Sequence, residues 1–345
     1  MEIFCDEFRL GQKNTKVIYT DEFPNFGESR EMLYVFDRST AAIYPRLPEG
    51  SLVLEPGEAT KSWAGVESII AAALKRGMAR DSYFIAVGGG MICDLTAFAA
   101  SVYMRGASVW LVPTSLLAMV DASFGGKTAI NFGGYKNIVG TFYPAGNIVI
   151  CSAFLRSLPR REYLSGLAEL IKYAMLGDAV LYRKLQKKGA ALLEKQDAAA
   201  ELDMIRRSLK AKARFAAKDP SETGVRAYLN LGHTFGHGLE SAAGLGRYTH
   251  GEAVAWGILR ALDAGKELCV TDPFYADGAA RLFAALGFPL RAQDVSAEAI
   301  IDAMGSDKKK KEGKLRFVLQ RGLCDTFTEN LDMALVRKVV ERGLK

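Results

Sequence analysis

Short apolar runs recur along the first 150 residues, separated by stretches of helical or turn-like composition. They are rich in β-branched and aromatic side chains, which favour strands, and they occupy residues 16–20, 32–36, 51–55, 83–87, 108–112 and 147–151. Residues 61–77 show the apolar spacing of a helix. Strands that alternate with helices predict a parallel sheet flanked by helices.

From about Pro159 onward the pattern changes to long helical periods. Residues 163–176 and 198–218 are typical of helices, and residues 315–327 have the pattern of a hairpin. The predicted fold class is therefore α/β, with a Rossmann-like parallel-sheet domain at 1–155 that suits a nucleotide. A mostly α-helical domain is expected at 156–345.

Composition places the chain among ordinary globular proteins, because 49% of its 345 residues are hydrophobic and 24% are charged. There is no apolar run of about 18 residues, and the first residues carry acids where a signal peptide carries bases. We therefore expect a cytoplasmic protein that does not enter a membrane. Five scattered cysteines without a CxxC pair argue against a disulfide framework and against a thiolate zinc site.

The net charge of +6 is mild for this length. One dense basic run, at residues 306–314, has the ordinary interpretation of a solvated loop. No aromatic side chains alternate with these lysines, so nucleic acid is not an expected partner.

Three glycines, Gly88, Gly89 and Gly90, follow a predicted buried strand and precede a helix. Glycine lets the backbone approach a phosphate closely, and a helix N-terminus favours an anion. The pattern is not GxGxxG, so a tight turn without a ligand is the alternative. Asp94, in the first helical turn, is also explained by the helix dipole alone.

A second glycine-rich stretch surrounds Lys127 and precedes Lys136 and Asn137. We expect irregular backbone here that presents two ammonium groups to an anion. A solvent-exposed loop with lysines is the alternative.

All three histidines, His233, His237 and His250, fall within 18 positions. The first two are spaced i, i+4 and share one helix face, and the connector before His250 is long enough to return a second helix beside the first. Such a cluster fits a divalent metal. Glu169, in an otherwise apolar helix, is the best candidate for a carboxylate ligand, although an i, i+3 ion pair with Lys172 competes with that role.

These residues lie in a set of motifs that resembles the 3-dehydroquinate synthase family of sugar phosphate cyclases. The motifs run through most of the chain and include "GGGMICDLTAFAASVYMRG", "VPTSLLAMVDASFGGKTAIN", "AELIKYA", "LNLGHTFGHGLE", "HGEAVAWG" and "DKK". Three positions depart from the family: Ser39 stands where asparagine is usual, Pro220 where an acid is common, and Gly238 where alanine is usual. The glycine should cost its helix about 1 kcal/mol.

The resemblance implies an NAD-binding domain joined to a metal domain, with the active site in the cleft between them. It implies that Zn²⁺ or Co²⁺ is held by Glu169, His233 and His250. The implied NAD contacts are Glu58, Lys61, Gly88, Gly89, Gly90, Asp94, Thr114, Ser115, Asp121, Lys127 and Lys136, with Phe154 and Ser157 over the adenine. The implied catalytic and substrate residues are Lys127, Asn137, Lys172, Lys212, Arg226, Asn230, His237 and one of Lys308 or Lys309, with Arg105 serving the neighbouring subunit of a homodimer.

The implied enzyme is an NAD- and metal-dependent carbon–oxygen lyase of the shikimate pathway, in aromatic amino-acid biosynthesis. It would convert 3-deoxy-D-arabino-heptulosonate 7-phosphate to 3-dehydroquinate and phosphate through transient oxidation, phosphate elimination, re-reduction and aldol closure. The alternatives are a sister cyclase for another sugar phosphate, a metal- and NAD-dependent polyol dehydrogenase, and a catalytically inactive sensor. Lys127, Lys212 and Arg226 argue against a polyol substrate, which needs no cluster of anion-binding side chains.

Overall fold

A computed structural model describes residues 2–11, 13–194, 197–219, 224–244, 246–308 and 315–344. The chain forms two units, and each has its own core. Unit 1 comprises Met1–Pro159 and Asp197–Leu209, and unit 2 comprises Arg160–Gln196 and Lys210–Lys345. No helix in the described ranges is both long and apolar enough to cross a membrane.

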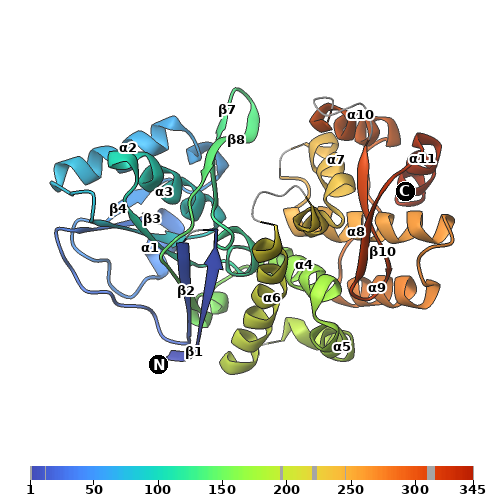
Figure 1. Cartoon of the computed structure of the whole chain (residues 1–345), viewed down its shortest axis with the longest axis horizontal. Helices are drawn as coiled ribbons and strands as arrows, with labels where there is room; N and C mark the ends of the chain where they lie inside the picture. The colour runs from blue at the N-terminus through green and yellow to red at the C-terminus, as the bar shows by residue number, and fades with distance from the viewer. Residues whose placement is uncertain are drawn as a thin grey trace. The chain divides into compact units, whose positions relative to one another are not determined.

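Most of unit 1 is drawn in blue to green in Figure 1. It is built on a seven-stranded sheet of order β1-β2-β9-β6-β5-β3-β4. Its strands are β1 (Glu2–Leu10), β2 (Lys13–Thr20), β3 (Met32–Asp37), β4 (Leu52–Leu54), β5 (Tyr83–Gly88), β6 (Ser108–Pro113) and β9 (Asn147–Cys151). All neighbours pair in parallel except β1, which runs antiparallel to β2 at the edge. The predicted parallel sheet is confirmed, and its central strands are buried because helices cover them.

Helices of unit 1 alternate with these strands. They are α1 (Arg38–Ile43), α2 (Trp63–Lys75) and α3 (Gly90–Val102), with short turns η1 (Glu58–Thr60), η2 (Tyr103–Arg105), η3 (Ala118–Ala122) and η4 (Ser152–Arg156). The chain passes from β3 to β4 on one side of β3 and then to β5 on the other side. Strand order therefore reverses between β3 and β5, and the carboxyl ends of strands at such a point are where open α/β sheets bind ligands.

The second glycine-rich stretch is regular, which corrects the expectation of irregular backbone. It forms an antiparallel hairpin of β7 (Lys127–Phe132) and β8 (Tyr135–Phe142). Gly133 and Gly134 make its two-residue turn with φ of 60° and 83°, values that glycine adopts without strain. Much of β8 is exposed, so the hairpin lacks the in-and-out alternation by which a strand is predicted.

Unit 2 is mostly helical, as predicted. Its elements are α4 (Arg160–Gly177), α5 (Ala179–Lys188), η5 (Gly189–Leu193), the end of α6 (Ala198–Lys218), η6 (Val225–Asn230), α7 (His233–Ala243), α8 (His250–Glu267), α9 (Pro273–Leu286), α10 (Ala297–Lys308), α11 (Met333–Arg342) and the hairpin β10 (Arg316–Gly322) and β11 (Asp325–Asn330). Helix α8 is the centre of the unit and packs against α4, α7, α9, α11 and β10.

Glycines let the helices of unit 2 approach one another closely. A Cβ atom on Gly257 of α8 would lie 2.0 Å from the carbonyl oxygen of Gly232, before α7. A Cβ atom on Gly251 would lie 2.2 Å from the carbonyl oxygen of Ser165 in α4. Because glycine has no side chain at these two positions, α8 can lie close to both α7 and α4.

Candidate metal centre and nucleotide site

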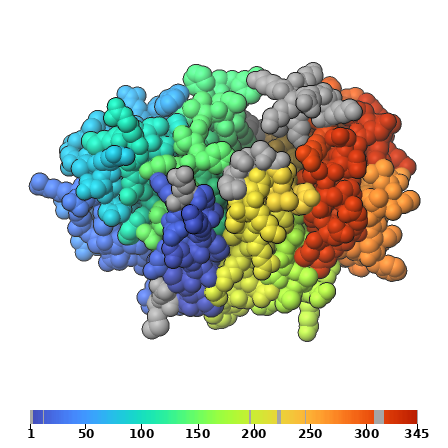
Figure 2. All heavy atoms as spheres, in the orientation of Figure 1, coloured from blue at the N-terminus to red at the C-terminus, as the bar shows by residue number. Residues whose placement is uncertain are grey.

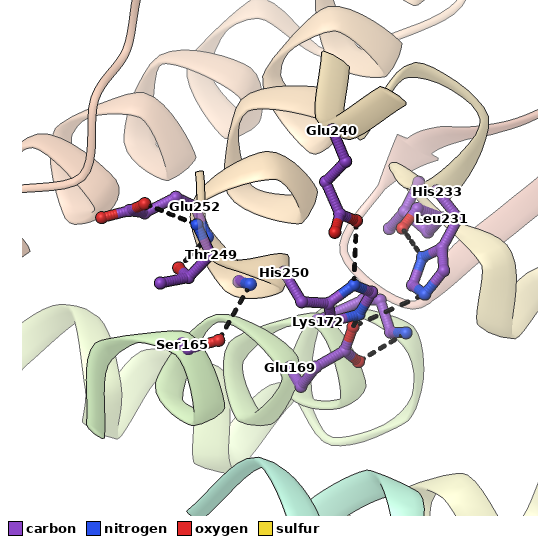
Figure 3. A network of polar contacts seen from close by, with 10 residues as sticks. Ser165, Glu169, Lys172, Leu231, His233, Glu240, Thr249, His250 and Glu252 are labelled. Atoms are coloured by element: carbon purple, nitrogen blue, oxygen red, sulfur yellow. Dashed lines mark hydrogen bonds and ion pairs between the residues drawn. The ribbon is translucent and has the colours of Figure 1, made fainter. Parts of the chain in front are cut away.

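Three segments of unit 2 bring one carboxylate and two imidazoles together (Figure 3). Glu169 comes from the middle of α4, while His233 and His250 are the first residues of α7 and α8. The Nε2 atoms of His233 and His250 lie 3.6 and 3.3 Å from Oε1 of Glu169. One carboxylate oxygen and two imidazole nitrogens that face one point form a donor set that suits Zn²⁺ or Co²⁺ and leaves room for a substrate atom.

Both imidazoles turn the same ring nitrogen away from Glu169. Nδ1 of His233 is 3.2 Å from the carbonyl oxygen of Leu231. Nδ1 of His250 is 3.2 Å from Oε2 of Glu240. Glu240 was missed by sequence reasoning, although its place seven residues after His233 puts it on the same face of α7.

The predicted ion pair between Glu169 and Lys172 also exists, so the two interpretations of Glu169 are compatible. Nζ of Lys172 is 2.6 Å from Oε2 of Glu169, and both side chains are almost fully buried. The other oxygen, Oε1, faces the imidazoles. Lys172 thus gives the buried carboxylate an opposite charge within an apolar helix.

The surroundings of the two imidazoles shift their pKa values in opposite directions. Burial, together with the charge of Lys172, holds the pKa of His233 well below its usual range. Burial also opposes the charged form of His250, but hydrogen bonds to Glu169 and Glu240 outweigh it and raise its pKa to about 10.

His237 lies next to the other two histidines, with its ring centroid 5.2 Å from that of His233 and 6.1 Å from that of His250. It is exposed, unlike the ring of His233. His237, Glu240 and His250 form a second group whose ligand atoms lie within 4.8 Å of one another. The histidine spacing predicted a cluster that includes His237, but not that Glu240 completes this second group.

One face of α4 contacts three successive residues at the start of α8. Arg161 binds Glu252, the Ser165 hydroxyl accepts a hydrogen bond from the amide of Gly251 at 3.0 Å, and Glu169 faces His250. The α4 residues are spaced four apart, so they occupy consecutive turns of one face. Glu252 and Thr249 cap each other, because each side chain accepts the other's backbone N–H. This fixes where α8 begins and therefore where His250 lies.

In unit 1, the predicted phosphate loop follows β5. A Cβ atom on Gly88 would lie 2.6 Å from Cβ of Ile92, so the strand-to-helix turn tolerates no side chain there. At Gly89 the nearest atom would be Oγ of Ser115, 3.7 Å away, on the neighbouring strand end. The amide of Thr114 bonds to the carbonyl of Gly88 at 2.9 Å. The loop thus combines close backbone approach with the N-terminus of α3, which suits a phosphate.

Lys61 connects two predicted site residues. Its buried ammonium lies 2.6 Å from Oδ2 of Asp94 and 2.5 Å from Oδ1 of Asn137. Burial raises the pKa of Asp94 to about 6, although Lys61 acts in the opposite direction. Asn131, which sequence reasoning missed, joins this cluster: its side chain donates to Glu58 at 2.9 Å and accepts from the amide of Asn137 at 2.9 Å.

The remaining predicted residues of unit 1 differ in exposure. Lys127 and Lys136 are exposed on the β7–β8 hairpin. Phe154 is 1% exposed and packs edge-on against Phe23, with ring centroids 4.9 Å apart. The Ser157 hydroxyl donates to the carbonyl of Phe154 at 3.1 Å. Asp121 lies in η3, after β6. Their contacts with a nucleotide stay predictions.

Arg105 has an unusual backbone conformation. Its φ is 65°, and that of Met104 is 47°, so two successive residues with side chains occupy the left-handed region. Each such residue costs about 1–2 kcal/mol. Tyr103 anchors the turn, because its buried hydroxyl donates to the carbonyl of Met78 at 2.7 Å.

The predicted substrate residues of unit 2 include two buried cations. Lys212 is 6% exposed, and its ammonium lies 5.6 Å from the ring centroid of Tyr173. Arg226 is 5% exposed, and its amide donates to Oδ2 of Asp219 at 3.0 Å. Asn230 is half-buried at the end of η6. The side chain of Lys308 and the whole of Lys309 lie outside the described residues.

Comparisons with known proteins cover nearly the whole chain. A family model described as 3-dehydroquinate synthase N-terminal matches residues 51–165, and one described as 3-dehydroquinate synthase C-terminal matches residues 166–310. The 3-dehydroquinate synthase of Acidithiobacillus ferrooxidans is 42% identical over 276 residues, which are 80% of this chain and 76% of that protein. That of Shewanella loihica is 36% identical over 336 residues, which are 94% and 93% of the two chains.

Among solved structures, 2-epi-5-epi-valiolone synthase from Streptomyces hygroscopicus, with NAD⁺ and Zn²⁺ bound, is 26% identical. The similarity covers 90% of each chain with a TM-score of 0.83. The two family models together match well over half of the chain, and the Shewanella loihica relative spans almost all of it. The chain belongs to the 3-dehydroquinate synthase family.

Proposed function

We propose that the chain converts 3-deoxy-D-arabino-heptulosonate 7-phosphate to 3-dehydroquinate and phosphate. The observation that carries this proposal is the convergence of Glu169, His233 and His250, because it supplies a metal site within the family's C-terminal domain. The family relatives named 3-dehydroquinate synthase support the same substrate. The cofactors proposed are NAD and Zn²⁺ or Co²⁺, supported by the NAD⁺ and Zn²⁺ of the Streptomyces cyclase.

We propose that Glu169, His233 and His250 hold the metal and that the loop Gly88–Gly90 receives the NAD pyrophosphate. When bound, NAD supplies a hydride acceptor that is regenerated within one turnover, and the metal supplies a Lewis acid. Lys172 pairs with the Glu169 carboxylate, and burial lowers the pKa of His233, which favours the neutral imidazole that a metal binds. Thr114 and Ser115 lie beside the loop just after β6, and Asp121 follows in η3; these three are the proposed nucleotide contacts.

The substrate carries a carboxylate and a phosphate, and the chain offers cations for both. Lys212 and Arg226 are buried in unit 2, where a low effective dielectric strengthens their attraction for an anion. Asn230 and His237 add hydrogen-bonding groups in the same unit. We propose that these four side chains orient the substrate, and that Lys127 and Asn137 of the hairpin serve it as well.

A direct assay tests this function. Purified protein with NAD and Zn²⁺ or Co²⁺ should release inorganic phosphate from the seven-carbon substrate, form 3-dehydroquinate and accumulate no NADH. Release of phosphate from another sugar phosphate, without turnover of this one, would identify a sister cyclase. Net NADH formation from a simple polyol would identify a dehydrogenase instead.

We also propose that two copies associate through unit 1, where Arg105 would serve the neighbouring subunit. Large apolar side chains are exposed near it: Val102 is 41%, Met104 is 47% and Phe142 is 62% exposed. The Thr141 hydroxyl donates to that of Ser101 at 3.0 Å, so β8 lies beside the end of α3. Figure 2 shows the β7–β8 segment, in green, at the surface. Sedimentation analysis should give a dimer that Met104→Glu dissociates.

The cytoplasmic location also remains a proposal. All five cysteines carry free thiols, as expected in a reducing compartment. Fractionation of cells that produce the tagged chain would test it.

A further inference from the structure

We propose that Glu240 is a positioning residue for the metal centre, because it fixes the orientation of the His250 ring. The inference rests on the metal site of the proposed function. Its basis is the contact between Nδ1 of His250 and Oε2 of Glu240 at 3.2 Å, opposite the contact between Nε2 and Glu169 at 3.3 Å (Figure 3).

The chemistry of the contact determines its direction. A carboxylate can only accept a hydrogen bond, so Nδ1 of His250 carries the proton and donates to Glu240. Nε2 is then the nitrogen that a metal can take. A carboxylate behind a ligating imidazole fixes the ring and makes it a stronger donor to the metal.

His233 provides an internal comparison. Its Nδ1 faces a backbone carbonyl, that of Leu231, at 3.2 Å. That acceptor is fixed by the chain itself. His250 is the first residue of α8, directly after the capping residue Thr249. The acceptor for its Nδ1 atom is a side chain of another helix, Glu240 of α7. The acceptor behind His250, at Nδ1, is therefore a single side chain that can be replaced.

Different contacts restrain the backbone and the imidazole ring of His250. The cap formed by Thr249 and Glu252 fixes the backbone at the start of α8. It does not restrict rotation of the imidazole about its side-chain bonds. Glu240, whose side chain is 20% exposed, restrains the ring at Nδ1, opposite the contact of Nε2 with Glu169.

Glu240 also belongs to the group with His237 and His250, which offers a competing role as a direct metal ligand. The two roles respond differently to glutamine. An amide oxygen still accepts a hydrogen bond from Nδ1 but is a weaker ligand than a carboxylate. Glu240→Gln should therefore retain most of the metal affinity if Glu240 positions the ring, and lose it if Glu240 is a ligand.

The experiment measures Zn²⁺ affinity by competition with a chelator. Glu240→Ala should raise the dissociation constant about 10- to 100-fold, the range typical of lost outer-sphere partners, and should shift the visible absorption of the Co²⁺ form. Glu240→Gln should rescue most of the loss, and His237→Ala should leave Zn²⁺ affinity unchanged. Glu341→Ala, at an exposed site on α11, is the matched control.

A second measurement does not depend on metal or turnover. The chain has three histidines, so a spectrum of protein labelled with ¹⁵N-histidine is simple to assign. In metal-free protein the Nδ1 proton of His250 should exchange slowly with water, and Glu240→Ala should remove that protection. Unaltered protection in Glu240→Ala, or unaltered Zn²⁺ affinity, would overturn the inference. If the native chain binds no Zn²⁺, the proposed function fails while the exchange result still tests the contact.

Discussion

Arg161 donates two hydrogen bonds to the carboxylate of Glu252, with N–O distances of 3.0 and 2.8 Å. A third hydrogen bond from Arg161 reaches the carbonyl of Arg247 at 2.6 Å. The same α4 face carries Glu169 two turns later, and Glu252 caps the helix that begins with His250. The ion pair therefore links the segments that supply two of the proposed metal ligands.

Replacement of Arg161 by methionine should destabilise the start of α8. Arg161 is half-exposed, so we expect a loss of only about 1 kcal/mol in the free energy of unfolding, together with weaker Zn²⁺ binding. Chemical denaturation and metal competition measure the two effects. Arg337→Met, which breaks an exposed pair with Glu298, should leave Zn²⁺ affinity unchanged. Equal effects of both replacements on Zn²⁺ affinity would contradict the link to His250.

Glu169→Gln should abolish both Zn²⁺ binding and turnover. It should also lower the free energy of unfolding by about 3–5 kcal/mol, because the buried Lys172 loses its counter-ion. Adding Lys172→Met removes the uncompensated charge and should restore most of the stability without restoring the metal. Denaturation curves and metal content separate these effects. A double variant as unstable as Glu169→Gln would show that the ion pair is not the cause.

Asp94 should titrate near neutral pH. Burial raises its pKa from 3.8 to about 6, while Lys61 lowers it. The folded chain thus holds this proton to a higher pH than the unfolded chain. The contribution of Asp94 to stability therefore falls as pH rises from about 4 to about 6. A carboxyl NMR titration measures the midpoint, and Lys61→Met should move it upward. A midpoint that stays or falls in this variant would refute the assigned cause.

Gly238→Ala should destabilise unit 2, although alanine favours helices. The new Cβ atom would lie 2.5 Å from Cγ of Met304 and 3.0 Å from the carbonyl oxygen of Ile300, both on α10. Crowding of this kind costs about 1–3 kcal/mol, more than the gain of about 1 kcal/mol in helix propensity. Gly305→Ala, on α10 with open space around it, is the control and should stabilise. Stabilisation by both variants in thermal unfolding would contradict this packing.

Sequence patterns predicted the elements that depend on local periodicity. The runs at 83–87 and 147–151 are strands β5 and β9, and residues 198–218 are the helix α6. The β7–β8 hairpin was missed because its second strand is exposed along most of its length and shows no alternation. The sequence does not explain why glycine stands at position 238, because the α10 residues that would crowd a side chain there lie about sixty residues further along the chain.

The candidate site was only partly predictable for a related reason. Histidine spacing and a lone acid in an apolar helix pointed to Glu169, His233 and His250, because rare residue types stand out. Glu240 and Asn131 are common polar residues whose significance depends on which atom they face. Each is the last residue of a quoted family motif, but a motif does not show which atom a side chain faces, because that information is three-dimensional.

Glu169 and His250 lie 81 positions apart along the polypeptide. Before folding, bringing them together requires the closure of a long loop, whose entropy opposes the encounter. A divalent ion would therefore recognise the finished fold rather than the nascent chain, and its binding energy would add to the stability of unit 2. A bound ion would therefore stabilise the tertiary structure of unit 2 after the chain has folded, in addition to its part in the reaction.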